Sequence, residues 1–387
     1  MKPLFSNGNT LQLLNNGAAY FPALEEAIDS ARYTVSLETY LFADDVTGRR
    51  IAAALARAAH RGLTVRVLVD GFGSNDVFDE LRQQLLAAKV QVLIYHPKIS
   101  PLTLRLKRLR RLHRKLVVID DRVVFVGGIN IIDDMNSPGH LAPRYDYAVC
   151  IEGPLVSMAV KEIEELWSRV ALVNFQWDWR GRKTLILETP SAGKQRAAFV
   201  VRDNLRHRSD IEDAYLDGIR QAQREIIIVN AYFFPGQRFR RALRLAVRRG
   251  VRVILLLQGR VEYKLLHYAS QALYENLLDA GVEIFEYQDS FLHAKVAVID
   301  TRWATVGSSN IDPFSLLLAR EANVVVDDSL FAEELRASIH NHIVVGATKV
   351  EMSVWHSQPL WRRCIVWCAY GCARLIIGLA GLGLGSR

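Results

Sequence analysis

Two stretches of the chain, 180 residues apart, carry the same reactive side chains at the same spacing. HRKLVVIDDRVVFVGGIN covers residues 113–130, and HAKVAVIDTRWATVGSSN covers residues 293–310. In each stretch a Lys follows a His by two positions, an Asp follows it by seven and an Asn follows it by seventeen. The residues so placed are His113, Lys115, Asp120 and Asn130 in the first copy, and His293, Lys295, Asp300 and Asn310 in the second.

Each copy is expected to form a β-hairpin, with the apolar runs KLVVI and KVAVI as the first strand of each. Side chains alternate between the two faces of a strand, so the His and the Lys of each copy point the same way. Asp120 and Asp300 have the opposite phase and fall at the turn. The imidazole and ammonium groups therefore share a site, and the two Asp are expected to support local structure.

Two His, two Lys and two Asn in one pocket suit a phosphate group. Lys supplies positive charge to the non-bridging oxygens, and Asn supplies an amide donor. The small pairs Gly127–Gly128 and Gly307–Ser308 allow close approach of the backbone. One neutral His can attack phosphorus while the other, protonated, gives its proton to the leaving oxygen. A metal site is disfavoured, because each His has a Lys two residues away and no zinc-type ligand cluster is present.

A nucleophilic His needs a partner that orients its second ring nitrogen, and this partner is usually a carboxylate. Asp146 in RYDYAVCIEGP and Glu321 in REANVVV occupy matching places after the two motifs. Either they orient the histidines or they are ordinary solvated carboxylates. The sequence does not choose between these alternatives.

The elements around the motifs repeat as well, which predicts an α/β fold with two similar domains and an active site at their interface. In each half a β-rich run, an amphipathic helix ending in Gly and a second apolar strand precede the His/Lys motif. With ETPSAGKQ as the linker, the expected domains are residues 1–190 and 191–345, followed by an apolar tail at 346–387. The matching segments are 33–42, 46–62 and 63–71 in the first half, and 224–234, 236–250 and 251–259 in the second.

The paired His-x-Lys-x4-Asp motifs, each followed by x6-Gly-Gly or x6-Gly-Ser and then x-Asn, resemble those of the phospholipase D superfamily. ETYLFADDVTGRRIAAALARAAHRGLTVRVLVDGFGS is similar to the bacterial cardiolipin synthase branch, in particular to its members without leading transmembrane helices. The resemblance implies phosphatidyl transfer through a phosphohistidine, without a metal or cofactor, that yields cardiolipin and an alcohol such as glycerol. A phospholipase D-type hydrolase or a nuclease is the alternative. The catalytic residues that it implies are His113, Lys115, Asp120, His293, Lys295 and Asp300.

The net charge of +8 suits an anionic partner but does not separate lipid from nucleic acid. Between residues 102 and 115, LTLRLKRLRRLHRK mixes basic residues with Leu and contains no aromatic residue. Grooves for single-stranded nucleic acid usually interleave basic with aromatic side chains. The stretch therefore indicates anionic and zwitterionic phospholipids at a membrane surface as partners, with no nucleic acid and no obligate protein partner.

The C-terminal stretch CIVWCAYGCARLIIGLAGLGLG, residues 364–385, has the length of a membrane span. Arg374 at its centre makes insertion unfavourable by about 2.5–3.5 kcal/mol. Flanking Trp and Arg residues favour an interfacial or re-entrant anchor, which predicts a peripheral or monotopic protein of the cell inner membrane. A buried soluble helix is the alternative.

Overall fold

The computed structural model describes residues 3–74, 77–96, 110–137, 141–179, 189–203, 206–260, 264–312, 319–353 and 359–385. Most of the basic stretch at 102–115 and Trp355 therefore lie outside the described residues. Within the described residues, sixteen strands form one sheet that runs through both halves of the chain, and two short strands form a second sheet.

The first half contains three helices on one face of its strands and one on the other. Its elements, in chain order, are β1 (Phe5–Asn15), α1 (Asn16–Ser30), β2 (Thr34–Thr39), α2 (Val46–His60), β3 (Thr64–Asp70), α3 (Asp79–Ala87), β4 (Gln91–Tyr95), β5 (Arg111–Leu112), β6 (Lys115–Ile119), β7 (Val123–Gly127), β8 (Arg144–Tyr145), β9 (Tyr147–Glu152), α4 (Val156–Val173) and the 3-10 turn η2 (Trp177–Trp179).

The second half repeats most of this order, with a second helix between β12 and β13 and with β18 and α12 in addition at its end. Its elements are β10 (Gln195–Arg202), α5 (Asp210–Gln221), β11 (Glu225–Asn230), α6 (Gln237–Arg248), β12 (Arg252–Gln258), α7 (Lys264–Gln271), α8 (Tyr274–Leu278), β13 (Glu283–Tyr287), β14 (Phe291–Leu292), β15 (Lys295–Ile299), β16 (Trp303–Gly307), β17 (Ala319–Asp327), α10 (Ser329–Gly346), β18 (Ala347–Lys349) and α12 (Leu360–Gly385).

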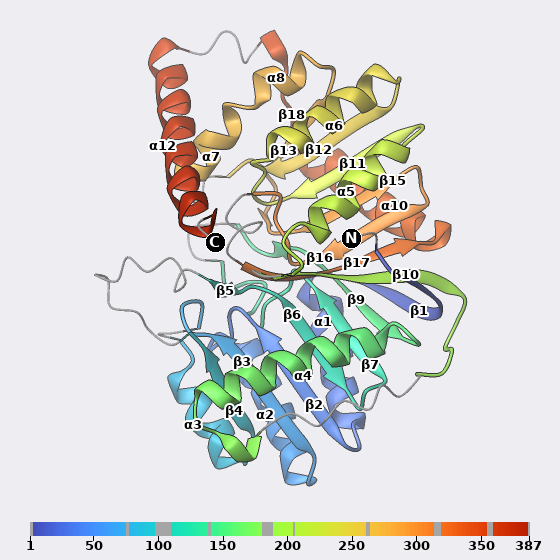
Figure 1. Cartoon of the computed structure of the whole chain (residues 1–387), viewed down its shortest axis with the longest axis vertical. Helices are drawn as coiled ribbons and strands as arrows, with labels where there is room; N and C mark the ends of the chain where they lie inside the picture. Colours follow the sequence, from blue (N-terminus) through green and yellow to red (C-terminus); the bar gives the residue numbers. More distant parts are fainter. Residues whose placement is uncertain are drawn as a thin grey trace.

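The two halves lie on either side of the junction in one sheet, and their strands follow the same order outward from it (Figure 1). From the junction outward the first half runs β1-β9-β7-β6-β2-β3-β4, and the second runs β10-β17-β16-β15-β11-β12-β13. The last three strands of each series are parallel to one another, and the others in each series pair antiparallel. In the second half β18 adds an antiparallel strand at the edge, beside β13. β1 and β10 pair antiparallel and join the halves. The expected α/β fold with two similar halves is confirmed, and the halves share a sheet.

The repeated helices form where the sequence pattern predicts them. In α2 the side chain of Asp45 accepts a hydrogen bond from the backbone N–H of Gly48, which caps the first turn. In α6 the residues Phe239, Leu243 and Ala246 are buried, a spacing that gives one apolar stripe. Gly62 and Gly250 follow the two helices with φ of 90° and 86°, a conformation that suits Gly at a helix end.

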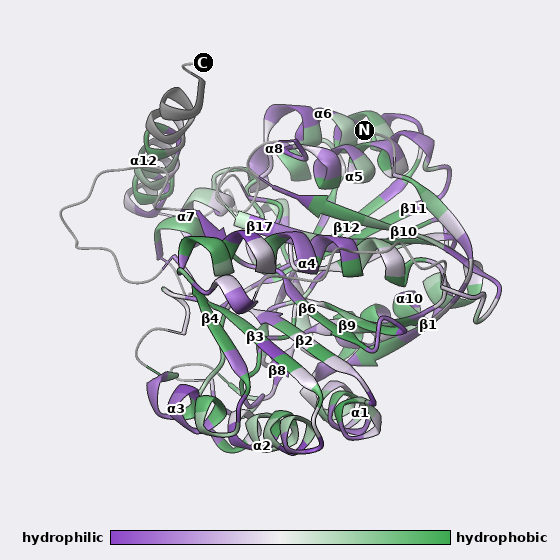
Figure 2. Cartoon of the chain, turned by 60° about the horizontal axis from the view of Figure 1, so that its bottom comes forward, coloured by the Kyte–Doolittle hydropathy of each residue, from purple (hydrophilic) through white to green (hydrophobic). Residues whose placement is uncertain are grey.

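Most of the apolar core lies in three clusters, and a smaller fourth cluster lies between α4 and the strands β3 and β4. One buried cluster lies under α1, α2 and α3, and another lies under α5, α6 and α8. The third draws strands from both halves together with α4 and α10, so the halves share a continuous core. Figure 2 shows hydrophobic residues concentrated along the strands, with the helices mixed in character.

The C-terminal helix α12 packs against α7 at the edge of the second half (Figure 1). Val366, Ala369 and Ala373 are buried, and the last two join the core cluster of the second half. The opposite face leaves Trp361 and Leu375 about two-thirds exposed, at 65% and 64%. Among the described helices, none has the length and hydropathy needed to cross a membrane.

Candidate active site

Each motif His lies between a short strand and a long one. His113 follows β5 and precedes β6, while His293 follows β14 and precedes β15. β6 and β15 are central strands whose five residues are all buried, and each forms a hairpin with the next strand, β7 or β16. The predicted hairpins are therefore present, and each motif begins where its hairpin enters the core.

Two short parallel ladders connect each motif to the opposite half. β5 pairs with the start of β17, so that Leu112 lies opposite Arg320. β14 pairs with β8, so that Leu292 lies opposite Tyr145. In each ladder the His and the candidate carboxylate of the other half are the next residues along the two strands.

The ladders bring each His onto a carboxylate from the other half. Nδ1 of His113 lies 2.9 Å and 3.1 Å from the two carboxylate oxygens of Glu321. Nδ1 of His293 lies 2.6 Å from Oδ2 of Asp146. The backbone N–H of His113 donates to the carbonyl of Arg320 at 3.0 Å, and that of His293 to the carbonyl of Tyr145 at 2.8 Å. The structure therefore brings together the residues predicted from sequence, with each His–carboxylate pair crossing the interface.

Burial dominates the electrostatics of the site. It lowers the pKa of His113, against the charge and hydrogen bond of Glu321, and it lowers the pKa of His293 well below its usual value, with help from Lys295 and Lys115. Burial raises the pKa of Asp146 to about 7. Both imidazoles are thus held neutral near pH 7 in the absence of an anion. Because a bound phosphate would counter the lysine charges, it would favour protonation of one imidazole.

The two motif lysines lie deep in the same site. Nζ of Lys115 donates to the carbonyl of His113 at 2.6 Å, and Nζ of Lys295 makes the equivalent bond to His293. Burial, with the charge of Lys295, lowers the pKa of Lys115 to about 7. Nζ of Lys115 also lies 5.5 Å from the ring centre of Tyr40. This concentration of buried positive charge favours an anionic substrate group.

Asp120 and Asp300 lie at the far ends of their strands and hold backbone. The carboxylate of Asp120 accepts hydrogen bonds from the N–H groups of residues 32, 33 and 34 at 2.7–2.8 Å. The carboxylate of Asp300 accepts equivalent bonds from residues 223, 224 and 225 at 2.7–2.9 Å. Each pins the start of a parallel strand, β2 or β11, to the hairpin turn.

The small residues of the motifs lie against the carboxylates. A Cβ added at Gly128 would lie 2.2 Å from Oδ1 of Asp146, so this position excludes larger residues. At the equivalent position the hydroxyl of Ser308 donates to Oε2 of Glu321 at 2.5 Å. The Gly-to-Ser difference between the copies therefore gives one carboxylate an additional donor.

The two motif asparagines are buried at the ends of their hairpins. Oδ1 of Asn130 accepts from the backbone N–H of Leu41 at 3.2 Å. Oδ1 of Asn310 has no hydrogen-bond partner among the described residues. Sequence reasoning missed Tyr40, whose ring centre lies 5.1 Å from that of His113, and the donor role of Ser308. The sequence did carry a signal for Tyr40, since Tyr232 occupies the matching place after the repeated strand of the second half.

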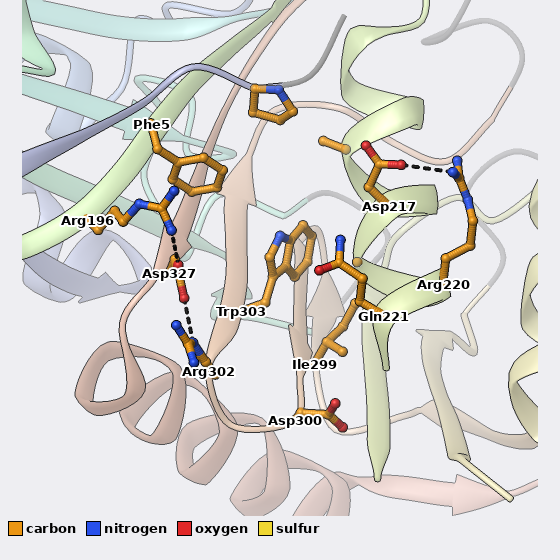
Figure 3. A pocket seen from close by; sticks show the side chains of 13 residues that line it. Phe5, Arg196, Asp217, Arg220, Gln221, Ile299, Asp300, Arg302, Trp303 and Asp327 are labelled. Atoms are coloured by element: carbon orange, nitrogen blue, oxygen red, sulfur yellow. Dashed lines mark hydrogen bonds and ion pairs between the residues drawn. The ribbon is translucent and has the colours of Figure 1, made fainter. Parts of the chain in front are cut away.

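The described residues contain no group of three His, Cys, Asp or Glu side chains that could hold a metal ion. A large hollow of about 820 Å³ lies beside Asp300, Trp303 and Phe5, at the end of the hairpin remote from Lys295 (Figure 3). Neither motif His lines it. This hollow is therefore separate from the site of the paired histidines.

The fold and the paired histidine motifs define a member of the phospholipase D superfamily. Among solved structures, phosphatidylserine synthase of Haemophilus influenzae Rd KW20 aligns with a TM-score of 0.69 at 16% identity, covering 96% of this chain and 94% of that one. Polyphosphate kinase of Porphyromonas gingivalis aligns with a TM-score of 0.56 at 12% identity, covering 97% and 53%. At these identities the likeness concerns the fold.

Sequence comparison defines the family more narrowly. The family described as cardiolipin synthase, PLD-like domain, matches residues 24–167 and 215–343. Cardiolipin synthase B of Escherichia coli (strain K12) is 43% identical over 363 residues, which cover 93% of this chain and 87% of the relative. Cardiolipin synthase A of Pseudomonas fluorescens is 32% identical over 337 residues, covering 86% and 68%. The chain belongs to the cardiolipin synthase family, phosphatidyltransferases of the phospholipase D superfamily.

Proposed function

We propose that the enzyme makes cardiolipin by moving a phosphatidyl group from one phospholipid to a hydroxyl group of another, through a covalent phosphohistidine. The observation that carries this proposal is the pair of largely buried imidazoles, 18% and 14% exposed, each bound through Nδ1 to a carboxylate of the opposite half. That arrangement leaves Nε2 of both rings for the substrate. One ring can then be the nucleophile while the other transfers the proton.

The reaction balances in two displacements at phosphorus. In the first, Nε2 of one His forms a bond to phosphorus, and the bond from phosphorus to the departing alcohol oxygen breaks. The other His, protonated, gives its proton to that oxygen, which leaves as an alcohol such as glycerol. In the second displacement, the His that gave up its proton takes the proton of the acceptor hydroxyl. The acceptor oxygen attacks phosphorus, and the bond from phosphorus to Nε2 of the nucleophilic His breaks.

Lys115 and Lys295 neutralise the charge of the phosphodiester in both displacements, and Asn130 and Asn310 donate amide hydrogen bonds to its oxygens. Glu321 and Asp146 are positioning residues, because each fixes the ring and tautomer of its His. Asp120 and Asp300 act through the backbone they hold. No cofactor is required, since one phosphodiester replaces another.

We place the two catalytic domains at residues 1–190 and 191–345, joined through β1 and β10, and assign residues 346–387 to membrane contact at the cell inner membrane. The exposed apolar face of α12 supports the assignment, since Trp and Leu side chains suit the interface of a bilayer. The partners are then anionic and zwitterionic phospholipids, with the protein held peripherally or monotopically.

The decisive test uses His113→Ala and His293→Ala, with His340→Ala on α10 as a matched control. His340 is exposed. Lipid extraction after incubation with phosphatidylglycerol vesicles should show cardiolipin with the wild type and the control, and at least a thousandfold less with either motif variant. Rapid quench with phosphorus-labelled lipid should trap a labelled, acid-labile enzyme. Substantial cardiolipin formation by a folded motif variant would refute the two-histidine mechanism.

A further inference from the structure

A second hollow, of about 270 Å³, lies where the two halves meet, on the side of α4. It is lined by Lys161, Glu162, Glu165 and other residues of α4, by residues 203, 206 and 207 after β10, and by Arg320 at the start of β17. Neither motif His nor motif Lys lines this hollow. It is therefore a separate feature formed by both halves.

Three cations of this lining have no close ion pair, and two of them, Lys161 and Arg206, are exposed. Lys161, Arg206 and Arg320 make no ion pair with any described carboxylate. Nε of Arg320 is buried and has no hydrogen-bond partner among the described residues. A buried, unpaired guanidinium donor is costly unless a ligand or water satisfies it. The cavity therefore has positive charge available for an incoming group.

The acids of the lining are already engaged elsewhere. Glu162 lies 3.4 Å from Nη1 of Arg114, and Glu165 lies 2.9 Å from Nη2 of Arg169. Asp203 accepts the backbone N–H groups of residues 206 and 207 at 2.8 Å and 2.9 Å. None of these three carboxylates forms an ion pair with Lys161, Arg206 or Arg320, so the donors of the three cations point to no acid of the lining.

The hollow of Figure 3 provides the contrast. There Arg196 and Arg302 both pair with Asp327, and Arg220 pairs with Asp217 at 3.1 Å. Every arginine drawn in that cavity is paired, so it offers no comparable attraction to an anion. Both hollows contain carboxylates. They differ in whether their cations form ion pairs with those carboxylates.

We propose that the hollow beside Lys161, Arg206 and Arg320 binds a phosphate group at a site distinct from the catalytic one. Arginine presents several donors to phosphate oxygens, and lysine adds a point charge. The phosphate belongs either to a phospholipid headgroup or to a free phosphate. The proposal does not depend on the transfer reaction.

The position of Arg320 connects this site to the catalytic residues. Successive residues of a strand point to opposite faces, so Arg320 faces the hollow while Glu321 faces His113. The carbonyl of Arg320 also accepts the backbone N–H of His113. A phosphate held by Arg320 would therefore stabilise the ladder that positions His113.

The test compares two double variants that remove the same charge. Lys161→Ala with Arg206→Ala alters the proposed site, and Arg244→Ala with Arg248→Ala alters exposed cations on α6 as the matched control. Binding of inorganic phosphate is measured by equilibrium dialysis. Binding to phosphatidylcholine vesicles with and without phosphatidylglycerol is measured by flotation. A third double variant, Lys161→Glu with Arg206→Glu, reverses the charge of the proposed site. Circular dichroism establishes that the wild type and the three double variants are folded.

We expect the wild type and the control to bind two equivalents of phosphate and the site variant to bind one. If the site variant instead binds phosphate like the control but binds vesicles about tenfold more weakly, the proposed site binds the phosphate of a lipid headgroup. Equal binding of both probes by the site variants and the control would overturn it. Because no turnover is measured, this result is independent of the histidine variants.

Discussion

Asp120 belongs to the repeated motif by its spacing. The structure nevertheless predicts that replacing it lowers the free energy of unfolding and affects activity only indirectly. Five residues of β6 separate it from the site end of the strand, and at about 3.3 Å per residue this is about 16 Å. Oδ1 of Asp120 accepts the N–H groups of Tyr33 and Thr34, and Oδ2 accepts that of Arg32. A direct contact with the reacting phosphorus is incompatible with this placement.

The cost of Asp120→Asn follows from those three bonds. Asn preserves an oxygen for two of the N–H groups but turns an NH₂ toward the third, so one charge-assisted bond is lost and the others weaken. Hydrogen bonds to charged groups contribute about 1.5–3 kcal/mol each, and exposed N–H groups recover part of this from water, so we expect about 2 kcal/mol. Asp120→Ala should cost about 4 kcal/mol, because it removes all three bonds and strains a residue whose φ is 52°.

Urea unfolding monitored by circular dichroism measures these changes, with Asp300→Asn as the symmetric variant and Glu26→Gln on α1 as a charge-matched control. Transfer activity is measured in parallel, well below the unfolding midpoint. We expect Asp120→Asn and Asp300→Asn to lose stability while retaining at least a tenth of the activity. An Asp120→Asn enzyme with unchanged stability and abolished activity would refute the reasoning.

The remaining predictions concern the positioning carboxylates and α12. Glu321→Gln should lower the rate of phosphatidyl transfer by about 10²–10⁴-fold without unfolding the protein, because it removes the charge that stabilises a protonated His113. A pH–rate profile identical to that of the wild type would contradict a positioning role for Glu321. Burial raises the pKa of Asp146 to about 7, so the folded state retains a proton that the unfolded state loses above about pH 4. The Asp146 carboxyl therefore contributes its full stabilisation below about pH 4 and has lost it once the pH has risen through 7. The free energy of unfolding of Asp146→Asn, measured by urea titration, should rise relative to that of the wild type between pH 5 and 8. A difference between the two proteins that does not change with pH would argue against the raised pKa. Trp361→Ser with Leu375→Ser should weaken vesicle flotation but spare turnover of a short-chain, water-soluble phosphodiester, and equal flotation would exclude α12 as the membrane contact.

The sequence predicted the fold class because the hydrophobic periodicity was repeated in two halves. The intact motifs also indicated which side chains meet at the candidate site, and their catalytic roles stay predictions. The strand phase also predicted that Asp120 would point away from His113. Which His each carboxylate orients could not be predicted, because the answer depends on the ladders β5–β17 and β8–β14, and these short strands have no local signal. The single sheet through both halves was also not evident, since pairing of β1 with β10 is a long-range contact.

The role of the C-terminal segment was only partly evident from sequence. Its length suited a membrane span, but Arg374 and the flanking Trp and Arg residues favoured an interfacial or re-entrant anchor, with a buried helix as the alternative. The structure gives α12 a buried stripe through Ala369 and Ala373 as well as an exposed apolar face. Deleting the segment would therefore uncover part of α7, and substitutions on its outer face are the cleaner experiment. Sequence hydropathy alone cannot separate the two faces when both are apolar.

The crossed pairing of histidines and carboxylates has a consequence during synthesis of the chain. His113 leaves the ribosome long before Glu321, and the carboxylate that orients it is absent until most of the second half has been made. Asp146 is made early, but its partner His293 is not. A nascent chain shorter than 293 residues therefore contains neither of the two His–carboxylate pairs. Both pairs form only after synthesis has passed Glu321, so assembly of the candidate site requires both halves of the chain.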